Sequence, residues 1–86
     1  MKFNLKGKTA IVTGGGSGIG RAISITLASQ GAMVHIFELK AESASEVVKE
    51  IEASGGSAIA HECNVANHSD VKEKVSAIGS GGLIEI

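Results

Sequence analysis

The chain has 86 residues, of which 43% are hydrophobic and 20% charged, and its formal net charge at pH 7 is −1. At this length it forms at most one domain with a small core, because only roughly 60–65% of the unfolded surface can be buried. Near-neutral charge and the presence of only two aromatic residues, Phe3 and Phe37, argue against nucleic-acid binding by a basic stripe or by base stacking.

Strands and helices are predicted to alternate along the chain. A β-branched run ended by glycines predicts a first strand, and apolar residues at helical spacing (Ile19, Ala22, Ile23, Leu27) predict a helix that ends before Gly31. The second helix follows from an apolar face opposite a row of acids, and the third follows from possible N-caps at Asn67 and Ser69. In chain order the expected elements are strand 9–13, helix 19–30, strand 33–37, a helix around 44–51, strand 57–63 and a helix carrying Val71, Val75 and Ile78.

This alternation predicts an α/β protein, a Rossmann-like three-layer α/β/α half-fold with a parallel sheet in the order 3-2-1. The alternating elements occupy residues 1–78, and residues 79–86 form a glycine-rich joint with a short apolar tail. The tail has two open interpretations: a short fourth strand giving the order 3-2-1-4, or residues foreign to the fold.

Five of the 12 glycines lie between positions 14 and 20, between the first strand and the first helix. Such a turn lets the backbone approach a phosphate group, and the helix N-terminus stabilises its charge. The triphosphate-binding pattern G-x-x-x-x-G-K-[ST] fails because Arg21 and Ala22 stand at its last two positions. The pattern G-x-G-x-x-G also fails, whereas T-G-x-x-x-G-I-G fits at Thr13, Gly14, Gly18, Ile19 and Gly20.

This segment resembles the cofactor loop of the short-chain dehydrogenase/reductases. The lead-in Leu5-Lys6-Gly7-Lys8 and the Gly31-Ala32 step before the second strand are similar to the same family, so that the resemblance covers roughly residues 3–78. It implies an oxidoreductase with a nicotinamide dinucleotide cofactor, in which residues 1–78 form the dinucleotide-binding segment. The implied cofactor-binding residues are Gly14, Ser17, Gly18, Ile19, Gly20, Glu38, Leu39, Asn64 and Val65.

The expected cofactor is NAD, with NADP less favoured. Glu38 ends the second strand about 20 residues past the glycines, where a carboxylate accepts hydrogen bonds from the adenosine ribose and repels a 2′-phosphate. NADP-using members of the family tend to carry a basic residue where this chain has Ser17, although Lys40 is a nearby cation. Asn64-Val65 stands where the family usually has Asp-Val beside adenine, and the asparagine carbonyl can still accept from the adenine amino group.

Family chemistry is hydride transfer between nicotinamide and an alcohol or carbonyl carbon, with a tyrosine as acid/base, a lysine and a serine. The sequence contains no tyrosine. We therefore expect a truncated form that lacks the catalytic half, with no catalytic residue assigned and no activity alone. The alternative is a non-catalytic short form that acts as a binding or self-association module.

Cys63 and the N-terminal residues indicate the compartment. A single cysteine forms no internal disulfide, and its spacing from His35, His61 and His68 matches no zinc-ligand set, so Cys63 is expected to be buried and no metal site is expected. His61 is interpreted as a half-exposed strand residue. No signal-peptide segment and no run of about 20 apolar residues is present, which predicts a soluble, cytoplasmic protein without membrane contact.

The topology also predicts association. The first two helices cover one face of the sheet and the third covers the other face alone, although parallel strands are normally buried on both faces. We therefore expect a homo-oligomer, or association through the uncovered sheet face or the exposed edge of the first strand.

Overall fold

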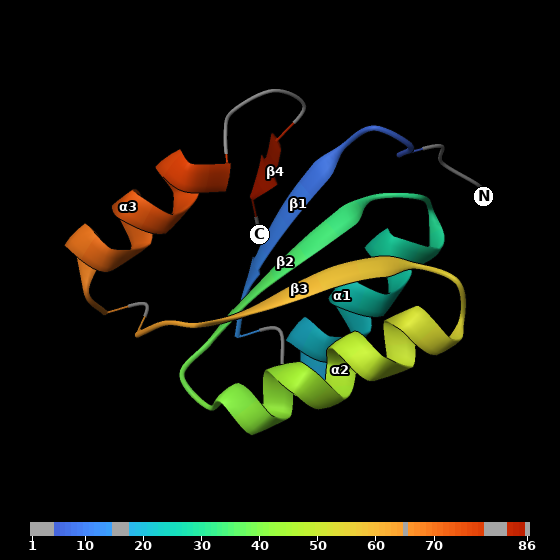
Figure 1. Ribbon diagram of the computed structural model, residues 1–86, viewed down its shortest axis with the longest axis horizontal. Helices are drawn as coiled ribbons and strands as arrows, with labels where there is room; N and C mark the ends of the chain where they lie inside the picture. The colour runs from blue at the N-terminus through green and yellow to red at the C-terminus, as the bar shows by residue number, and fades with distance from the viewer. Residues whose placement is uncertain (1–4, 15–17, 65, 79–82, 86) are drawn as a thin grey trace.

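The structure, a computed structural model, describes residues 5–14, 18–64, 66–78 and 83–85. Strands and helices alternate along these ranges, as the sequence predicts (Figure 1). The elements are β1 (Thr9–Thr13), α1 (Gly18–Ser29), β2 (Met33–Glu38), α2 (Ala41–Ala53), β3 (Ser57–Glu62), α3 (His68–Ile78) and β4 (Leu83–Glu85). Strand β1 occupies its predicted range, α1 is shifted by one residue at both ends, and β2 and β3 each differ from their predicted range by one residue at one end.

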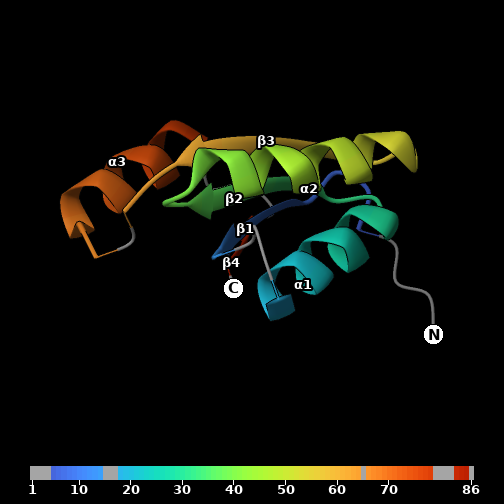
Figure 2. The ribbon, with the colours of Figure 1, turned by 90° about the horizontal axis from the view of Figure 1, so that it is seen from below.

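The four strands form one sheet in the order β3-β2-β1-β4, and every neighbouring pair is parallel. Figure 2 shows this order from the top of the view to the bottom. The interpretation of the tail as a fourth strand is confirmed, because Leu83–Glu85 pairs with Thr9–Ile11. The expectation of an exposed β1 edge is therefore wrong over these three residues, since β4 covers them.

The sheet separates two helical layers. In Figure 1 it runs between α3 on one side and α1 and α2 on the other. Side chains alternate along each strand, so Ala10 and Val12 face α1 and α2 whereas Ile11 faces α3. The predicted three-layer α/β/α arrangement is confirmed.

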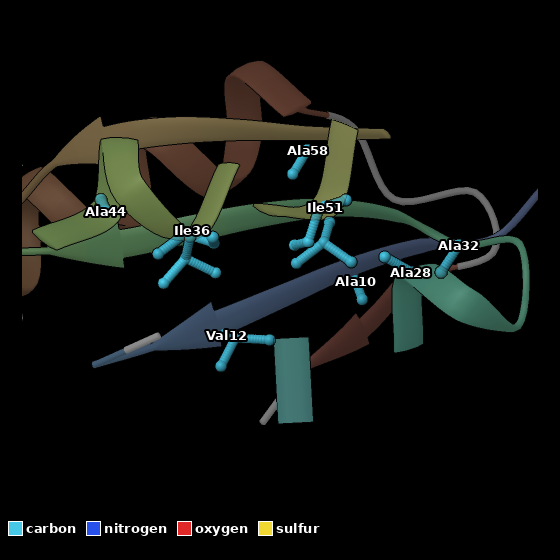
Figure 3. Close-up of a cluster of buried hydrophobic side chains, with 10 residues drawn as sticks. Ala10, Val12, Ala28, Ala32, Ile36, Ala44, Ile51 and Ala58 are labelled. Carbon is cyan, nitrogen blue, oxygen red and sulfur yellow. The ribbon is translucent and has the colours of Figure 1, made fainter. Parts of the chain in front are cut away.

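The larger core lies between the sheet and the pair α1 and α2 (Figure 3). Its buried members are Ala10, Val12, Ala28, Ala32, Val34, Ile36, Ala44, Val47, Ile51 and Ala58. The smaller core joins Ile11, Phe37 and Cys63 to the α3 side chains Val71, Val75 and Ile78. Cys63 is 2% exposed, which confirms its prediction as a buried residue, and burial raises the pKa of its thiol.

Helix α1 turns a different face to the sheet from the one that its apolar spacing indicates. Ser24 and Ala28 are its buried residues, whereas Ile19 and Ala22 are exposed. Small side chains let the helix pack closely on the strands, and the Ser24 hydroxyl is satisfied by donating to the Gly20 carbonyl at 2.9 Å. Ile23 and Leu27 are only half-buried and pack against the edge of the core. The apolar positions that predicted this helix are therefore not the ones buried at its centre.

The N-cap of α3 is the asparagine that the sequence indicates. The side-chain oxygen of Asn67 accepts a hydrogen bond from the Asp70 backbone N–H at 3.1 Å, while Ser69 lies inside the helix.

In the described part of the chain, no helix is both long enough and apolar enough to cross a membrane.

Candidate functional site

The candidate site lies at the edge of the sheet where β1, β2 and β3 end. Because these strands are parallel, the residues at or just after their ends, Gly14, Glu38 and Asn64, meet at one edge. Two backbone hydrogen bonds join the strand ends: Gly14 N–H donates to the Phe37 carbonyl at 2.8 Å, and Cys63 N–H donates to the Glu38 carbonyl at 3.0 Å. Ligands of open parallel sheets bind outside this carboxyl edge.

Two glycines bound the turn between β1 and α1. Gly14 has φ +66° and Gly18 has φ +56°, a left-handed conformation that side chains other than glycine rarely adopt. A Cβ atom built at either position meets no described atom within 4 Å. Ser17, together with residues 15 and 16, lies outside the described residues. Gly14 and Gly18 are therefore needed for their backbone conformation, and the space beside these two residues is open.

The N-terminus of α1 begins directly after this turn. The first backbone N–H groups of a helix have no partner within the helix, and the helix dipole makes this end positive. In α1 these N–H groups belong to Gly18, Ile19 and Gly20. The first turn of α1 contains no acidic residue whose side chain would compete for these N–H groups. Ile19 is 81% exposed beside them. This arrangement suits an anionic group such as a phosphate.

Arg21, which stands at the lysine position of the triphosphate-binding pattern, is directed to another helix. Its guanidinium donates through two nitrogens to the two carboxylate oxygens of Glu50 in α2, and this hydrogen bonding raises the pKa of Arg21. The pair is partly exposed and links α1 to α2. Arg21 therefore acts as a bridge between helices, and sequence spacing gave no signal of this partner 29 residues away.

Glu38 ends β2 and is half-buried. One of its carboxylate oxygens accepts the backbone N–H of Lys40, the N-cap residue of α2, at 3.4 Å. Leu39 between them is 63% exposed and presents an apolar surface at the same edge. An acid and an apolar side chain thus lie next to each other where β2 ends.

A depression of about 410 Å³ opens beside these residues. It is lined by Lys40, Ala41, Glu42, Ser43 and Glu62. Glu62 was not among the predicted site residues, although its place at the end of β3 is a signal that could have found it. The size is within the range of small-molecule sites, about 300–1,000 Å³.

Asn64 follows β3 and is exposed. Its side-chain oxygen accepts the Ala66 backbone N–H at 3.0 Å, which orients the carboxamide. A carbonyl oxygen has two lone pairs, so a second donor can still be accepted, and the side-chain NH2 group can donate. Val65 lies outside the described residues.

The structure thus brings Gly14, Gly18, Ile19, Gly20, Glu38, Leu39 and Asn64 to one edge of the sheet. Backbone donors and a positive helix end lie at the β1 side, and an acid with an apolar neighbour lies at the β2 side. A molecule carrying phosphates at one end and hydroxyl groups near the other matches this order. The shape and polarity therefore fit a nucleotide, with the phosphates on the glycine turn.

The comparisons with known proteins agree with this arrangement. A family profile described as short chain dehydrogenase matches residues 8–82. The chain is 41% identical over 86 residues to the short-chain dehydrogenase/reductase homolog YusS of Bacillus subtilis, covering 98% of this chain and 79% of that protein.

Solved structures give the same result. The citronellol catabolism dehydrogenase AtuB of Pseudomonas aeruginosa superposes with a TM-score of 0.84 at 41% identity, over 91% of this chain and 33% of that one. A 7 alpha-hydroxysteroid dehydrogenase complexed with NADH and 7-oxo glycochenodeoxycholic acid superposes with a TM-score of 0.78 at 41% identity, over 81% of this chain and 28% of that one.

The chain spans only part of most such relatives, for example 33% of the 7alpha-hydroxysteroid dehydrogenase of Escherichia coli K12. The match lies in their N-terminal region, the part of the fold that carries the glycine turn and the first three strands. Members of the family use nicotinamide cofactors, and the matched structures include complexes with NAD and NADH. The glycine turn, the sheet order and these similarities together show that the chain belongs to the short-chain dehydrogenase/reductase family.

Proposed function

We propose that this chain binds NAD along the carboxyl edge of its sheet, as the N-terminal cofactor-binding part of an oxidoreductase. The observation that carries the proposal is the glycine turn, with positive φ at Gly14 and Gly18, tied to the end of β2 where Glu38 stands. Residues 1–78 form the cofactor-binding segment in this proposal.

The phosphates of the cofactor contact the turn and the start of α1. Gly14, Ser17, Gly18, Ile19 and Gly20 supply backbone groups to the pyrophosphate. Support comes from the unpartnered N–H groups expected at the first turn of α1, from the lack of acids there and from the open space beside Gly14 and Gly18.

Glu38 accepts hydrogen bonds from the ribose hydroxyls and selects NAD over NADP. Its carboxylate carries a negative charge at the position where NADP has a 2′-phosphate, so the two groups repel each other. Arg21 does not offset this repulsion, because its guanidinium is paired with Glu50. Lys40 is exposed nearby and makes the preference for NAD smaller than it would otherwise be.

Leu39, Asn64 and Val65 surround the adenine ring. Leu39 offers an exposed apolar surface for the ring, and the Asn64 carboxamide is held in place by Ala66 N–H while retaining a free lone pair. The bound nicotinamide ring supplies a hydride acceptor or donor. None of the 86 residues is a tyrosine, so we assign the family's acid/base role to no residue here and expect no dehydrogenase activity from these residues alone.

Calorimetric titration with NAD, AMP and NADP tests the proposal. We expect AMP to bind nearly as well as NAD, because the described site contacts the adenosine and phosphate end, and we expect NADP to bind at least several-fold more weakly. In Glu38→Gln the NAD to NADP affinity ratio should fall towards one, since the repelling charge is removed.

Glu52→Gln is the matched control, because it removes the same charge from an exposed position near the end of α2. Its NAD to NADP ratio should equal that of the unchanged chain. Equal affinity for NAD and NADP in the unchanged chain would refute the role of Glu38, and absence of binding by all three nucleotides would refute the site.

The alternative of a purely non-catalytic interaction module gains no support from the relatives, which are named as dehydrogenases and reductases.

A further inference from the structure

The carboxamide of Asn64 is held in one orientation by the loop that follows β3. Its side-chain oxygen, Oδ1, accepts the backbone N–H of Ala66 at 3.0 Å, and its backbone carbonyl accepts the N–H of Asn67 at 2.9 Å. A backbone N–H only donates, so the atom that faces Ala66 is the oxygen, and the NH2 group points away from this bond. Turning the carboxamide over would break the bond to Ala66.

The carboxamide held in this way offers a donor and an acceptor side by side. Asn64 is exposed, its NH2 group can donate, and the second lone pair of Oδ1 can accept. The family usually has an aspartate at this position, and a carboxylate offers acceptors alone. Asn64 therefore adds a hydrogen-bond donor at the place where adenine is proposed to bind.

Asn64 stands close to the depression at the ends of β2 and β3. Glu62, which lines the depression, precedes Asn64 by two residues, so these two residues are at most about 7 Å apart along the chain. Lys40, which lines the depression from the β2 side, directly follows the exposed Leu39. A base that lies against Leu39 at this edge would have its polar edge within reach of Asn64.

We propose that Asn64 selects adenine over 6-oxopurines such as hypoxanthine, a selection that rests on the proposed binding of NAD. The 6-amino group of adenine donates to Oδ1, while a neighbouring ring nitrogen, N1 or N7, accepts from the NH2 group. Asparagine pairs with adenine through two such bonds when it reads DNA. In hypoxanthine an oxygen replaces the amino group, so two oxygens would face each other, and at N1 two N–H groups would face each other as well.

The bond to Ala66 makes this selection possible. An asparagine without such a bond could turn its carboxamide over and donate from its NH2 group to the 6-oxygen of hypoxanthine. Asn64 could do so only by losing the Ala66 bond and placing its NH2 group against the Ala66 N–H, where donor would face donor. A carboxylate at position 64 would not select in this way, because it accepts from the amino group of adenine and from the N1–H of hypoxanthine alike.

Calorimetric titration with NAD and with its 6-oxo analogue, nicotinamide hypoxanthine dinucleotide, tests the role of Asn64. In the unchanged chain we expect NAD to bind at least about fivefold more tightly, the lower end of what such a pair of bonds discriminates. Asn64→Asp keeps an acceptor for the Ala66 N–H and exchanges only the NH2 group for an oxygen. The ratio of the two affinities should therefore fall to within about twofold of one in this variant.

Asn67→Asp is the matched control, because it makes the same chemical change in the same loop and keeps the acceptor for the Asp70 N–H. Its affinity ratio should equal that of the unchanged chain. An unchanged ratio in Asn64→Asp, or an equal fall in Asn67→Asp, would overturn the role of Asn64. Glu62→Gln changes the other polar side chain near the base, and a fall in this variant but not in Asn64→Asp would assign the selection to Glu62 instead.

The same titrations separate this selection from the proposed function. Equal and measurable binding of the two dinucleotides to the unchanged chain would refute the selection by Asn64 and leave the NAD site in place. Absence of binding by both dinucleotides would refute the site, and the selection with it.

Discussion

Gly18 and Gly56 are both required by the fold, for different physical reasons. Gly18 has φ +56° and open space around it, so a side chain there meets conformational strain and no clash. Gly56 follows α2, and a Cβ atom at this position would lie 2.8 Å from the Cγ2 atom of Ile51 and 3.2 Å from the Cβ atom of Ala28. The two positions should therefore respond differently to the same substitution.

At Gly56 the expected effect of Gly56→Ala is a loss of about 1–3 kcal/mol of unfolding free energy from overpacking. Ile51→Leu removes the Cγ2 methyl group that the new Cβ would meet, at a cost of under about 1.5 kcal/mol. The double variant should therefore be more stable than the sum of the two single effects predicts. Urea unfolding monitored by circular dichroism measures this cycle, and strictly additive effects would disprove the clash.

At Gly18 the strain of a left-handed conformation predicts that Gly18→Ala loses about 1–2 kcal/mol. Gly18→Asn should lose less, because asparagine adopts this conformation more readily than alanine. Thermal unfolding of the two variants compares them directly. Equal losses in both would show that the conformation of Gly18 is not the cause.

At the scale of elements, helix α1 shows what a sequence pattern can predict. The β-branched run of β1 and the glycines around α1 located both elements to within a residue, because strand and turn preferences act locally. The buried face of α1 was not predictable in this way, because Ser24 and Ala28 are buried through their close approach to the sheet. The contacts of Arg21 with Glu50 and of His35 with the half-exposed His61 depend on how separate elements pack, and spacing along the chain carries no signal of that packing.

The ion pair of Arg21 with Glu50, which links α1 to α2, should stabilise the fold through charge rather than through burial. Arg21→Glu or Glu50→Arg alone should lower the melting temperature at low salt by placing like charges together, and the double swap should restore most of the loss. High salt should reduce all of these differences, because both side chains are partly exposed. Differential scanning calorimetry at two salt concentrations measures them, and an effect independent of salt would exclude an electrostatic bridge.

At the scale of the whole molecule, the two faces of the sheet are unequally covered. The face under α1 and α2 carries the larger core, whereas the α3 face leaves Met33 36% exposed and Ile59 44% exposed. The association predicted from this uncovered face remains a prediction. Helix α3 packs beside Ile11, Phe37 and Cys63, and the exposed Met33 and Ile59 lie on β2 and β3.

Ile59→Thr tests this surface while keeping a β-branched residue in the strand. We expect the unchanged chain to show a mass above the monomer that rises with concentration, and Ile59→Thr to shift it towards the monomer. Leu39→Thr removes an even more exposed apolar side chain outside the sheet face and should have little effect. Multi-angle light scattering over a concentration series gives the answer, and equal shifts in both variants would assign association to another surface.

The two hydrogen bonds that connect the ends of β1, β2 and β3 involve only main-chain atoms: Gly14 to Phe37 and Cys63 to Glu38. Main-chain bonds do not depend on which side chains the surrounding loops carry. The spacing between the turn and the acid can therefore persist while those loops change in sequence over evolutionary time. Such tolerance allows one scaffold to serve descendants with divergent specificities, because drift in the loops leaves the distances between strand ends unchanged.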